Sequence, residues 1–226
     1  MNADQIIVQL KSQADPAAVE GMARYGINPD NTLGISIPTL RGMAREIGKD
    51  HQLAGELWNS GIHEARILAS IIDDPNQVTE EQMERWVSDF DSWDVCDQVC
   101  SNLFDKTTFA YQKAIEWSGG EAEFIKRAGF ALIAALAVHD KQAGNELFEP
   151  FFPIIVRQAT DGRNYVKKAV SWALRNIGKR NRHLNTRAIE IAWKIEQIDS
   201  MVACWIANNA LKELTSNTIQ NRWSGK

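Results

Sequence analysis

The sequence predicts an all-α fold in which pairs of helices stack as a repeat array. Apolar residues recur at the helical spacing of three or four positions along nearly the whole chain, and no stretch alternates as a half-buried strand would. The connections are short, so consecutive helices are expected to pack antiparallel. With 226 residues, of which 44% are hydrophobic and 24% charged, the chain is long enough to bury a sizeable core. We expect residues 1–226 to form a single repeat domain.

Turn-forming residues separate the expected helices. Pro16 follows Asp15, a good N-cap residue, and Pro38 stands near the start of another helix. The pairs Gly119-Gly120 and Asp161-Gly162 mark turns. The expected helices span residues 3–12, 15–25, 38–48, 50–59, 62–73, 79–90, 93–104, 107–117, 121–137, 143–158, 163–178, 184–195 and 199–214.

A weak internal similarity indicates the repeat. Three segments begin with charged residues and continue with small and apolar ones: Glu64–Ala69, Lys126–Leu132 and Lys167–Leu174. The segment Trp93–Val99 occupies the corresponding place in the unit between the first two. Equivalent positions lie 31, 30 and 41 residues apart, at Arg66, Asp97, Arg127 and Lys168. This spacing is typical of helical hairpins that stack into a curved solenoid, and these positions would then begin inner helices lining one concave groove. Chance similarity among amphipathic helices is the alternative.

Charge is distributed unevenly along the chain. The formal net charge is −4, but residues 1–100 carry 7 basic and 17 acidic groups, whereas residues 101–190 carry 14 basic and 9 acidic groups. Eight basic residues and no acidic one stand between Arg163 and Arg187. An acidic half joined to a basic half indicates an oriented surface whose basic side faces a polyanion.

Residues 165–178, within this basic run, form an amphipathic helix with an unusual tryptophan. At about 100° per residue, the apolar stripe consists of Val166, Ala169, Val170, Ala173 and Ile177. Trp172 lies away from this stripe and near three cations, Lys168, Arg175 and Lys179. An aromatic ring among cations suits a surface that meets a sugar–phosphate backbone. The alternative is a solvated basic helix whose tryptophan packs against a neighbouring helix.

Two further features point to the same inferred groove. Trp93 and Asp97 are i,i+4 neighbours on one helix face, so that a ring and a carboxylate could contact one deoxyribose. A merely solvated Asp97 is the alternative. Arg127 lies in a largely apolar helix, where an unpaired charge would be costly. It therefore needs access to a cleft or an acidic partner, and pairing with Asp97 would give it a purely structural role.

Composition also limits the classes of function. The three cysteines and four histidines have no zinc-site spacing, so we expect no metal, and Cys96 and Cys100 are expected to be small core side chains. No apolar run of 18 residues is present, and the first residues do not resemble a secretory signal. We therefore expect a cytoplasmic protein.

The chain resembles the AlkD-type DNA alkylation-repair glycosylases, which are built of HEAT-like helical repeats. The resemblance covers most of the chain and rests on segments in a common order: Met22–Tyr25, Leu33–Arg41, Glu56–Trp58, Trp93–Asp97, Lys126–Ala128 and Lys168–Arg175. It implies that Asp97 is the catalytic residue, with Trp93 beside it. It also implies that Arg127 belongs to the active site and that Trp172 is the family's second tryptophan.

The resemblance implies hydrolysis of the N-glycosidic bond of cationic N3- or N7-alkylated purines in duplex DNA. The leaving base already carries positive charge, so one carboxylate suffices to stabilise an oxocarbenium-like sugar and to position water. The tryptophans would pack on the deoxyribose without the deep base flipping of other glycosylases. We expect a monomer that needs no cofactor and contacts DNA through Trp93, Arg127, Lys168, Trp172, Arg175 and Lys179.

Two other classes of function stay open. The chain departs from the family at Ser92, where the catalytic glycosylase has a second tryptophan, and in the longer segment between Arg127 and Trp172. The segment Met201–Leu214, with Trp205, also diverges. One alternative is therefore a non-catalytic HEAT-like module that binds DNA of unusual shape. The other is a protein-binding solenoid that uses its acidic N-terminal half.

Overall fold

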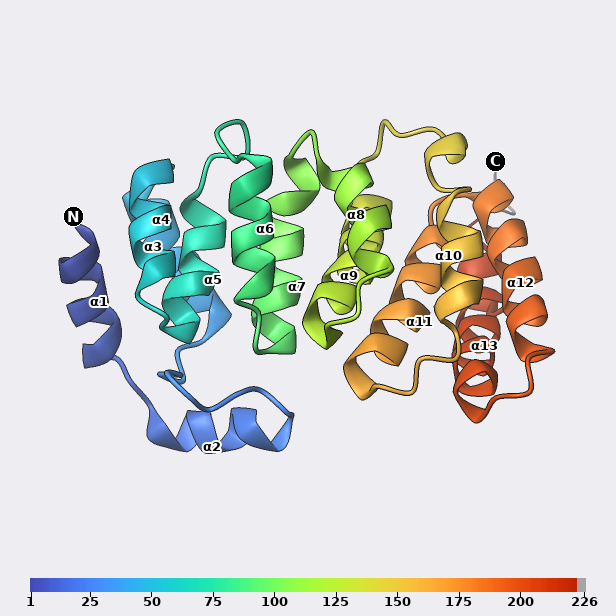
Figure 1. Cartoon of the computed structure of the whole chain (residues 1–226), viewed down its shortest axis with the longest axis horizontal. Coiled ribbons are helices and arrows are strands. Elements are labelled where there is room, and N and C mark those ends of the chain that lie inside the picture. The colour runs from blue at the N-terminus through green and yellow to red at the C-terminus, as the bar shows by residue number, and fades with distance from the viewer. Residues whose placement is uncertain (223–226) are drawn as a thin grey trace. The chain divides into compact units, whose positions relative to one another are not determined.

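The computed structural model describes residues 1–222 and contains only helical elements within that range (Figure 1). The chain divides into two compact units, Met1–Phe109 and Ala110–Lys226, which are described separately. The expectation of one domain over residues 1–226 stays a prediction. Within residues 1–222, no helix is both long and apolar enough to cross a bilayer.

The first unit is organised around α5. Its elements are α1 (Ala3–Ser12), α2 (Pro16–Arg24), α3 (Ile37–Ile47), α4 (His51–Asn59), α5 (His63–Ile72), α6 (Glu80–Ser88), α7 (Trp93–Asn102) and the 3-10 turn η1 (Phe104–Lys106). Helix α5 packs against α3, α4 and α7. The ring of Trp58, from α4, stacks on the ring of Trp86, from α6, with centroids 3.9 Å apart. The indole N–H of Trp58 donates to Asp89 Oδ2 at 2.8 Å. These contacts bury two large aromatic side chains, and the N–H of Trp58 is satisfied by its hydrogen bond.

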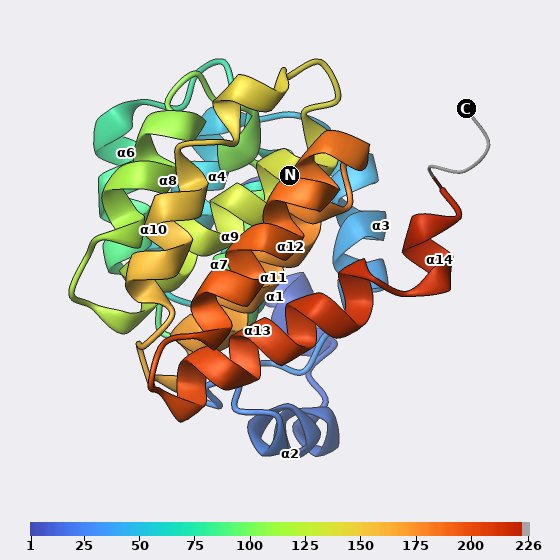
Figure 2. The same ribbon diagram turned by 90° about the vertical axis from the view of Figure 1, so that its right-hand side faces the viewer.

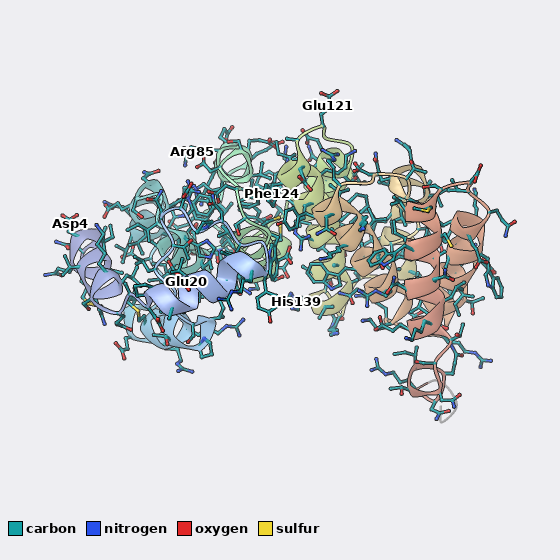
Figure 3. The ribbon with its side chains drawn as sticks, turned by 90° about the horizontal axis from the view of Figure 1, so that it is seen from below. Asp4, Glu20, Arg85, Glu121, Phe124 and His139 are labelled. Atoms are coloured by element: carbon teal, nitrogen blue, oxygen red, sulfur yellow. The ribbon has the colours of Figure 1, made fainter. Side chains whose placement is uncertain are left out.

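Helix α2 is a surface helix that runs crosswise to the other helices of this unit (Figure 1). None of its residues is buried, and Glu20, labelled in Figure 3, is exposed on it. Asp15 caps α2 as predicted, because its Oδ1 accepts the backbone N–H groups of Ala17 and Ala18 at 3.0 and 3.1 Å. Since burial contributes little, α2 depends on this cap and on the loop that follows it.

The second unit is organised around α9 and α11. Its elements are α8 (Ala110–Ser118), α9 (Glu123–His139), the 3-10 turn η2 (Asn145–Leu147), α10 (Phe151–Gln158), α11 (Asn164–Gly178), α12 (Arg182–Glu196), α13 (Met201–Leu214) and α14 (Asn217–Gln220). Helix α9 packs against α8 and α11, and α11 also contacts α10, α12 and α13. Figure 2 shows α14 as a short helix beyond the end of α13.

Most expected helices are confirmed, but the one expected over residues 143–158 begins later. Residues 145–147 form the turn η2, and the α-helix starts at Phe151. A helix from residue 143 would place Pro150 and Pro153 in its interior, where each lacks the N–H donor and clashes with the preceding turn. Starting at Phe151 leaves both prolines at the helix start, where no such donor is needed. The short α14 was not predicted.

The predicted inner helices begin at regular positions. Helices α5, α7, α9 and α11 start at residues 63, 93, 123 and 164, so each of the predicted groove positions falls in a first turn or just after it. The longer last interval contains η2 and the loop around it. Residues 126–137 of α9 are all buried, as its apolar composition predicted.

Gly129 allows α8 and α9 to approach closely, which provides a test of this packing. A Cβ atom at Gly129 would lie 2.3 Å from the backbone nitrogen of Ser118, and backbone cannot rotate away as a side chain can. We expect Gly129→Ala to lower the free energy of unfolding by about 1–3 kcal/mol in urea titrations.

Gly21→Ala in α2 is the matched control, because its added Cβ meets no atom within 4 Å. The control should be neutral or stabilising by up to about 1 kcal/mol, since alanine favours helix. A Gly129→Ala protein as stable as the parent would contradict the close packing.

Candidate functional site

Trp93 and Asp97 lie on α7, both partly exposed. Trp93 is the first residue of α7, and both side chains are half-buried, whereas Val95 and Cys96 between them are fully buried. The indole N–H of Trp93 donates to the backbone oxygen of Tyr25 at 3.2 Å. The ring is therefore held from one edge, by the residue that ends α2.

The start of α7 is fixed by a buried polar network. His63 Nε2 lies 2.9 Å from Asp94 Oδ2, and the hydroxyl of Ser92 donates to Asp94 Oδ1 at 2.5 Å. Burial opposes the charge of His63, but the hydrogen bond and the negative charge of Asp94 outweigh it and raise the pKa of His63. Burial likewise acts to raise the pKa of Asp94, yet the hydrogen bond from His63 leaves it lowered. Both directions favour an ion pair between the first residue of α5 and the first turn of α7.

A buried carboxylate holds the loop behind Trp93. The two oxygens of Glu64, a fully buried side chain, accept the backbone N–H groups of Leu33, Gly34 and Ile35 at 2.8, 2.7 and 3.2 Å. Three such bonds compensate the cost of removing the charge from water. Gly34 has φ +82°, and a Cβ there would lie 2.4 Å from the Asp15 backbone oxygen, so the tight approach requires glycine. The end of the segment that joins α2 to α3 is thus fixed to α5, and Tyr25 at its start accepts the N–H of Trp93.

Arg127 lies in the second unit, at the start of α9. Its side chain is buried, and its Nη1 donates to the backbone oxygen of Tyr165 at 2.8 Å. The ring of Tyr165 stacks on Phe124, labelled in Figure 3, with centroids 5.5 Å apart. Arg127 therefore joins the first turns of α9 and α11. Since Asp97 belongs to the other unit, pairing between these two residues stays a prediction.

Trp172 and Lys168 lie on α11 as the helical periodicity predicted. The five residues of the predicted apolar stripe are completely buried, whereas Trp172 is half-buried and Lys168 is exposed. Within residues 1–222, no hydrogen bond or ion pair joins the Lys168 ammonium to another group. Lys168 is therefore the predicted cation that is most available to an external phosphate.

Arg175 and Lys179 share an acidic partner that the sequence analysis missed. Arg175 Nη1 lies 2.6 Å from Glu213 Oε2, and Lys179 Nζ lies 2.8 Å from Glu213 Oε1. Burial acts to raise the pKa of Glu213, but hydrogen bonds from the two cations outweigh it and lower the pKa. Glu213 comes from α13, beyond the acid-free run, and only the packing of α13 on α11 brings it here. The basic face is thus partly neutralised by the protein itself.

Trp205 adds a second aromatic–cation pair that was also missed. Lys167 Nζ, from α11, lies 5.2 Å from the centroid of the Trp205 ring, and 38% of Trp205 is exposed. The sequence analysis noted Trp205 only as a departure from the family. An exposed indole under a cation resembles the platforms on which nucleobases stack.

Comparisons with known proteins agree with the predicted family. A family model described as DNA alkylation repair enzyme matches residues 6–214. The uncharacterized proteins Lin0241 of Listeria innocua and Lmo0209 of Listeria monocytogenes are 27% and 25% identical over 134 residues. These matches cover 57% of this chain and 59% of each relative, so the chain spans little more than half the length of these curated relatives.

A solved structure with the same fold was also found. It superposes with a TM-score of 0.78 over 94% of both chains, at 18% identity. That protein is described as one of a new family related to the HEAT-like repeat DNA glycosylases with affinity for branched DNA structures. The predicted all-α, HEAT-like repeat fold is thereby confirmed.

The ion pair of His63 and Asp94 predicts a pH-dependent stability. Because the pKa of His63 is raised on folding, its contribution is complete below the ordinary value of about 6.5 and is lost as pH rises through the folded-state pKa. The lowered pKa of Asp94 removes the pair again in strong acid. We expect His63→Gln, which can still donate a hydrogen bond, to be more destabilising at about pH 6 than at about pH 9.

Urea unfolding of the parent and of His63→Gln, at about pH 6 and about pH 9, measures how the loss of stability depends on pH. His183→Gln, at a largely exposed histidine of α12, is the matched control and should show little pH-dependent change. A destabilisation by His63→Gln that is equal at all pH values would exclude a charged pair.

Proposed function

The chain belongs to the family of DNA alkylation repair enzymes, and on that premise we propose that it is a DNA glycosylase. Its substrates would be cationic N3- and N7-alkylated purines in duplex DNA. The observation that best supports this proposal is the placement of Trp93 and Asp97 on α7, both half-buried, with the Trp93 N–H bonded to the Tyr25 backbone oxygen and the first turn of α7 bonded to His63 through Asp94. An aromatic ring and a carboxylate are thus held together on a rigid helix, as a sugar-binding catalytic pair requires.

The reaction needs few catalytic groups. When the N-glycosidic bond breaks, its electron pair moves to the alkylated base, whose positive charge is neutralised, and positive charge develops on the deoxyribose. The Asp97 carboxylate would stabilise that charge, more strongly in a partly buried site than in water. Water then adds to C1′ and loses a proton to Asp97 or to solvent. No proton has to be donated to the leaving base.

The residues of α11 would bind the DNA backbone. Exposed Lys168 would contact a phosphate directly, and half-buried Trp172 would pack against a sugar or base beside it. Arg175 and Lys179 would contact phosphates by exchanging the Glu213 carboxylate for a phosphate oxygen. Arg127, whose Nη1 donates to the Tyr165 backbone oxygen, would belong to the active site at the start of α9, as the resemblance implies.

A non-catalytic DNA-binding function is the second candidate. The solved relative with the same fold is described as having affinity for branched DNA structures, and Ser92 replaces the tryptophan found in the catalytic glycosylase. Such a module would bind junction DNA and release no base. Incubating the protein with duplex containing N7-methylguanine, followed by chromatography for the free base, decides between the two functions.

Asp97→Asn tests the catalytic assignment. The amide is nearly isosteric, so packing is conserved while the negative charge is lost. We expect single-turnover release of N7-methylguanine to fall by at least about 100-fold, with an unchanged melting temperature and unchanged or tighter duplex binding.

Asp4→Asn, at an exposed aspartate of α1 that Figure 3 labels, is the matched control and should retain full activity. A stably folded Asp97→Asn protein with full activity would leave the mechanism without its catalytic residue. A lowered melting temperature, with activity lost only in proportion to folded protein, would assign Asp97 a structural role.

Glu213→Gln tests whether the carboxylate competes with phosphate. Removing its charge frees two cations, so we expect the affinity for duplex DNA at low salt to rise about threefold or more. Lys168→Ala should instead weaken binding and lower the slope of log affinity against log salt by about 0.9. Fluorescence anisotropy over a salt series measures both effects.

Glu196→Gln, at an exposed glutamate of α12, controls for the change in net charge. Weaker binding by Glu213→Gln would show that Glu213 orients the two cations. Unchanged binding would exclude Arg175 and Lys179 from the DNA surface.

A further inference from the structure

A basic cavity lies in the second unit, at the C-terminal ends of α9 and α11. Its volume is about 430 Å³, and His139, labelled in Figure 3, marks the end of α9 beside it. Four of its lining residues are cations: Lys141, Lys179, Arg180 and Arg222. The other lining residues are Ala137, Val138, Ala143, Asn176 and Asn181, so none of the described residues that line it is acidic. Lys179 and Arg180 belong to the acid-free basic run between Arg163 and Arg187, whereas Lys141 and Arg222 lie outside it.

Arg180 is the fixed cation of this cavity. Its Nη1 donates to the backbone oxygen of Ala137 at 2.8 Å and its Nη2 to that of Ala143 at 3.0 Å, while the guanidinium lies 4.2 Å from the Phe148 centroid. Burial lowers the pKa of Arg180, which nevertheless stays charged in proteins. Its Nε is buried without a hydrogen-bond partner among the described atoms. The cavity wall therefore contains a positive charge that the helix end holds in place.

Two of the other cations are exposed, and the set is incompletely neutralised. Lys141 and Arg222 are exposed, and within residues 1–222 no carboxylate pairs with either of them. Lys179 is paired with Glu213, and Asp140 lies near Arg180. Both oxygens of Asp140 already accept hydrogen bonds, from the Tyr111 hydroxyl and from the backbone of residues 142 and 143. Four cations thus face two occupied carboxylates, which leaves a net positive site.

We propose that this cavity binds a phosphate group. The non-bridging oxygens of a phosphate can accept hydrogen bonds from several cations at once. The apolar lining of the cavity is limited to two alanines and a valine and could hold little organic surface. The walls are preorganised, because the Asn176 amide donates to the Ala134 backbone oxygen and the Asn181 amide donates to Asn145 Oδ1. Lys141 and Arg222 would close on the ligand from the exposed side.

The expected source of the phosphate is the DNA backbone, an assignment that rests on the proposed function. Lys179 belongs both to this cavity and to the basic face of α11 that contains Lys168. The helical rise places these two residues about 16 Å apart along α11, which corresponds to about five nucleotides of one strand. A strand that contacts Lys168 would therefore reach the cavity several phosphates further on. The alternative source is a free phosphate compound such as a nucleotide.

The double variant Lys141→Ala/Arg222→Ala tests the site without disturbing the buried Arg180. Its duplex affinity should fall by about tenfold at low salt, and the slope of log affinity against log salt should fall by about 0.9 for one lost phosphate contact. The matched control is Arg157→Ala/Lys194→Ala, which removes two exposed cations from α10 and α12 of the same unit. The control should leave the salt slope unchanged.

Pyrophosphate titration, followed by NMR on the full chain without DNA, distinguishes the two sources. If only the double variant loses pyrophosphate binding, while its DNA affinity and salt slope equal those of the parent, the site binds phosphate and takes it from a free compound. Equal salt slopes in parent, double variant and control, together with equal pyrophosphate binding, would overturn the proposal. Base release is measured separately, so a protein that binds DNA without excising a base leaves this inference intact.

Discussion

Charged side chains buried in the first turns of the inner helices must be bonded to a neighbouring segment, and this requirement determines how the helices can be placed. Glu64 of α5 accepts three backbone N–H groups of the preceding loop. Arg127 of α9 donates to the backbone of Tyr165, and Lys126 beside it lies 3.2 Å from Asp161, before α11. Breaking such a pair leaves a buried charge uncompensated, which typically costs about 3–5 kcal/mol. Each inner helix is therefore joined to an adjacent segment at a defined point, and the small apolar residues that follow complete the packing.

The same first turns contain the candidate functional residues. Asp97, Arg127 and Lys168 are each the fifth residue of their helix, so the repeat places these three candidates one turn inside a helix start. Buried partners hold the backbone of α5 and α9 there, while the side chain of Asp97 is half-buried and that of Lys168 is exposed. A catalytic or binding group needs this combination of fixed backbone and accessible side chain. Stability and candidate function thus depend on adjacent residues of one turn.

The sequence predicted what local periodicity determines. It predicted the buried stripe and the half-buried Trp172 of α11, and the complete burial of Cys96 and Cys100, because each follows from the angle between residues on a helix. It did not predict that Glu213 neutralises the basic face, because that contact depends on how α13 packs against α11, more than 30 positions away. The support of Trp93 by the Tyr25 backbone was missed for the same reason. Backbone acceptors leave no signature in a sequence, so the charges that they satisfy look unpaired.

Glu213 makes the basic face of α11 less positive than its composition indicates. The chain has a net charge of −4, so attraction to DNA at long range is weak and binding depends on short-range contacts. Under the proposed function, an internal carboxylate on two of the cations would lower the affinity for every duplex by a similar factor, whatever its sequence or damage. The contact of Asp97 with a lesion would be unaffected, because the described hydrogen bonds of the Glu213 carboxylate go to Arg175 and Lys179. Under the proposed function, Glu213 therefore weakens binding to undamaged DNA without weakening recognition of the damaged nucleotide. Such a protein would leave undamaged sites quickly, and its preference for damaged sites would be preserved.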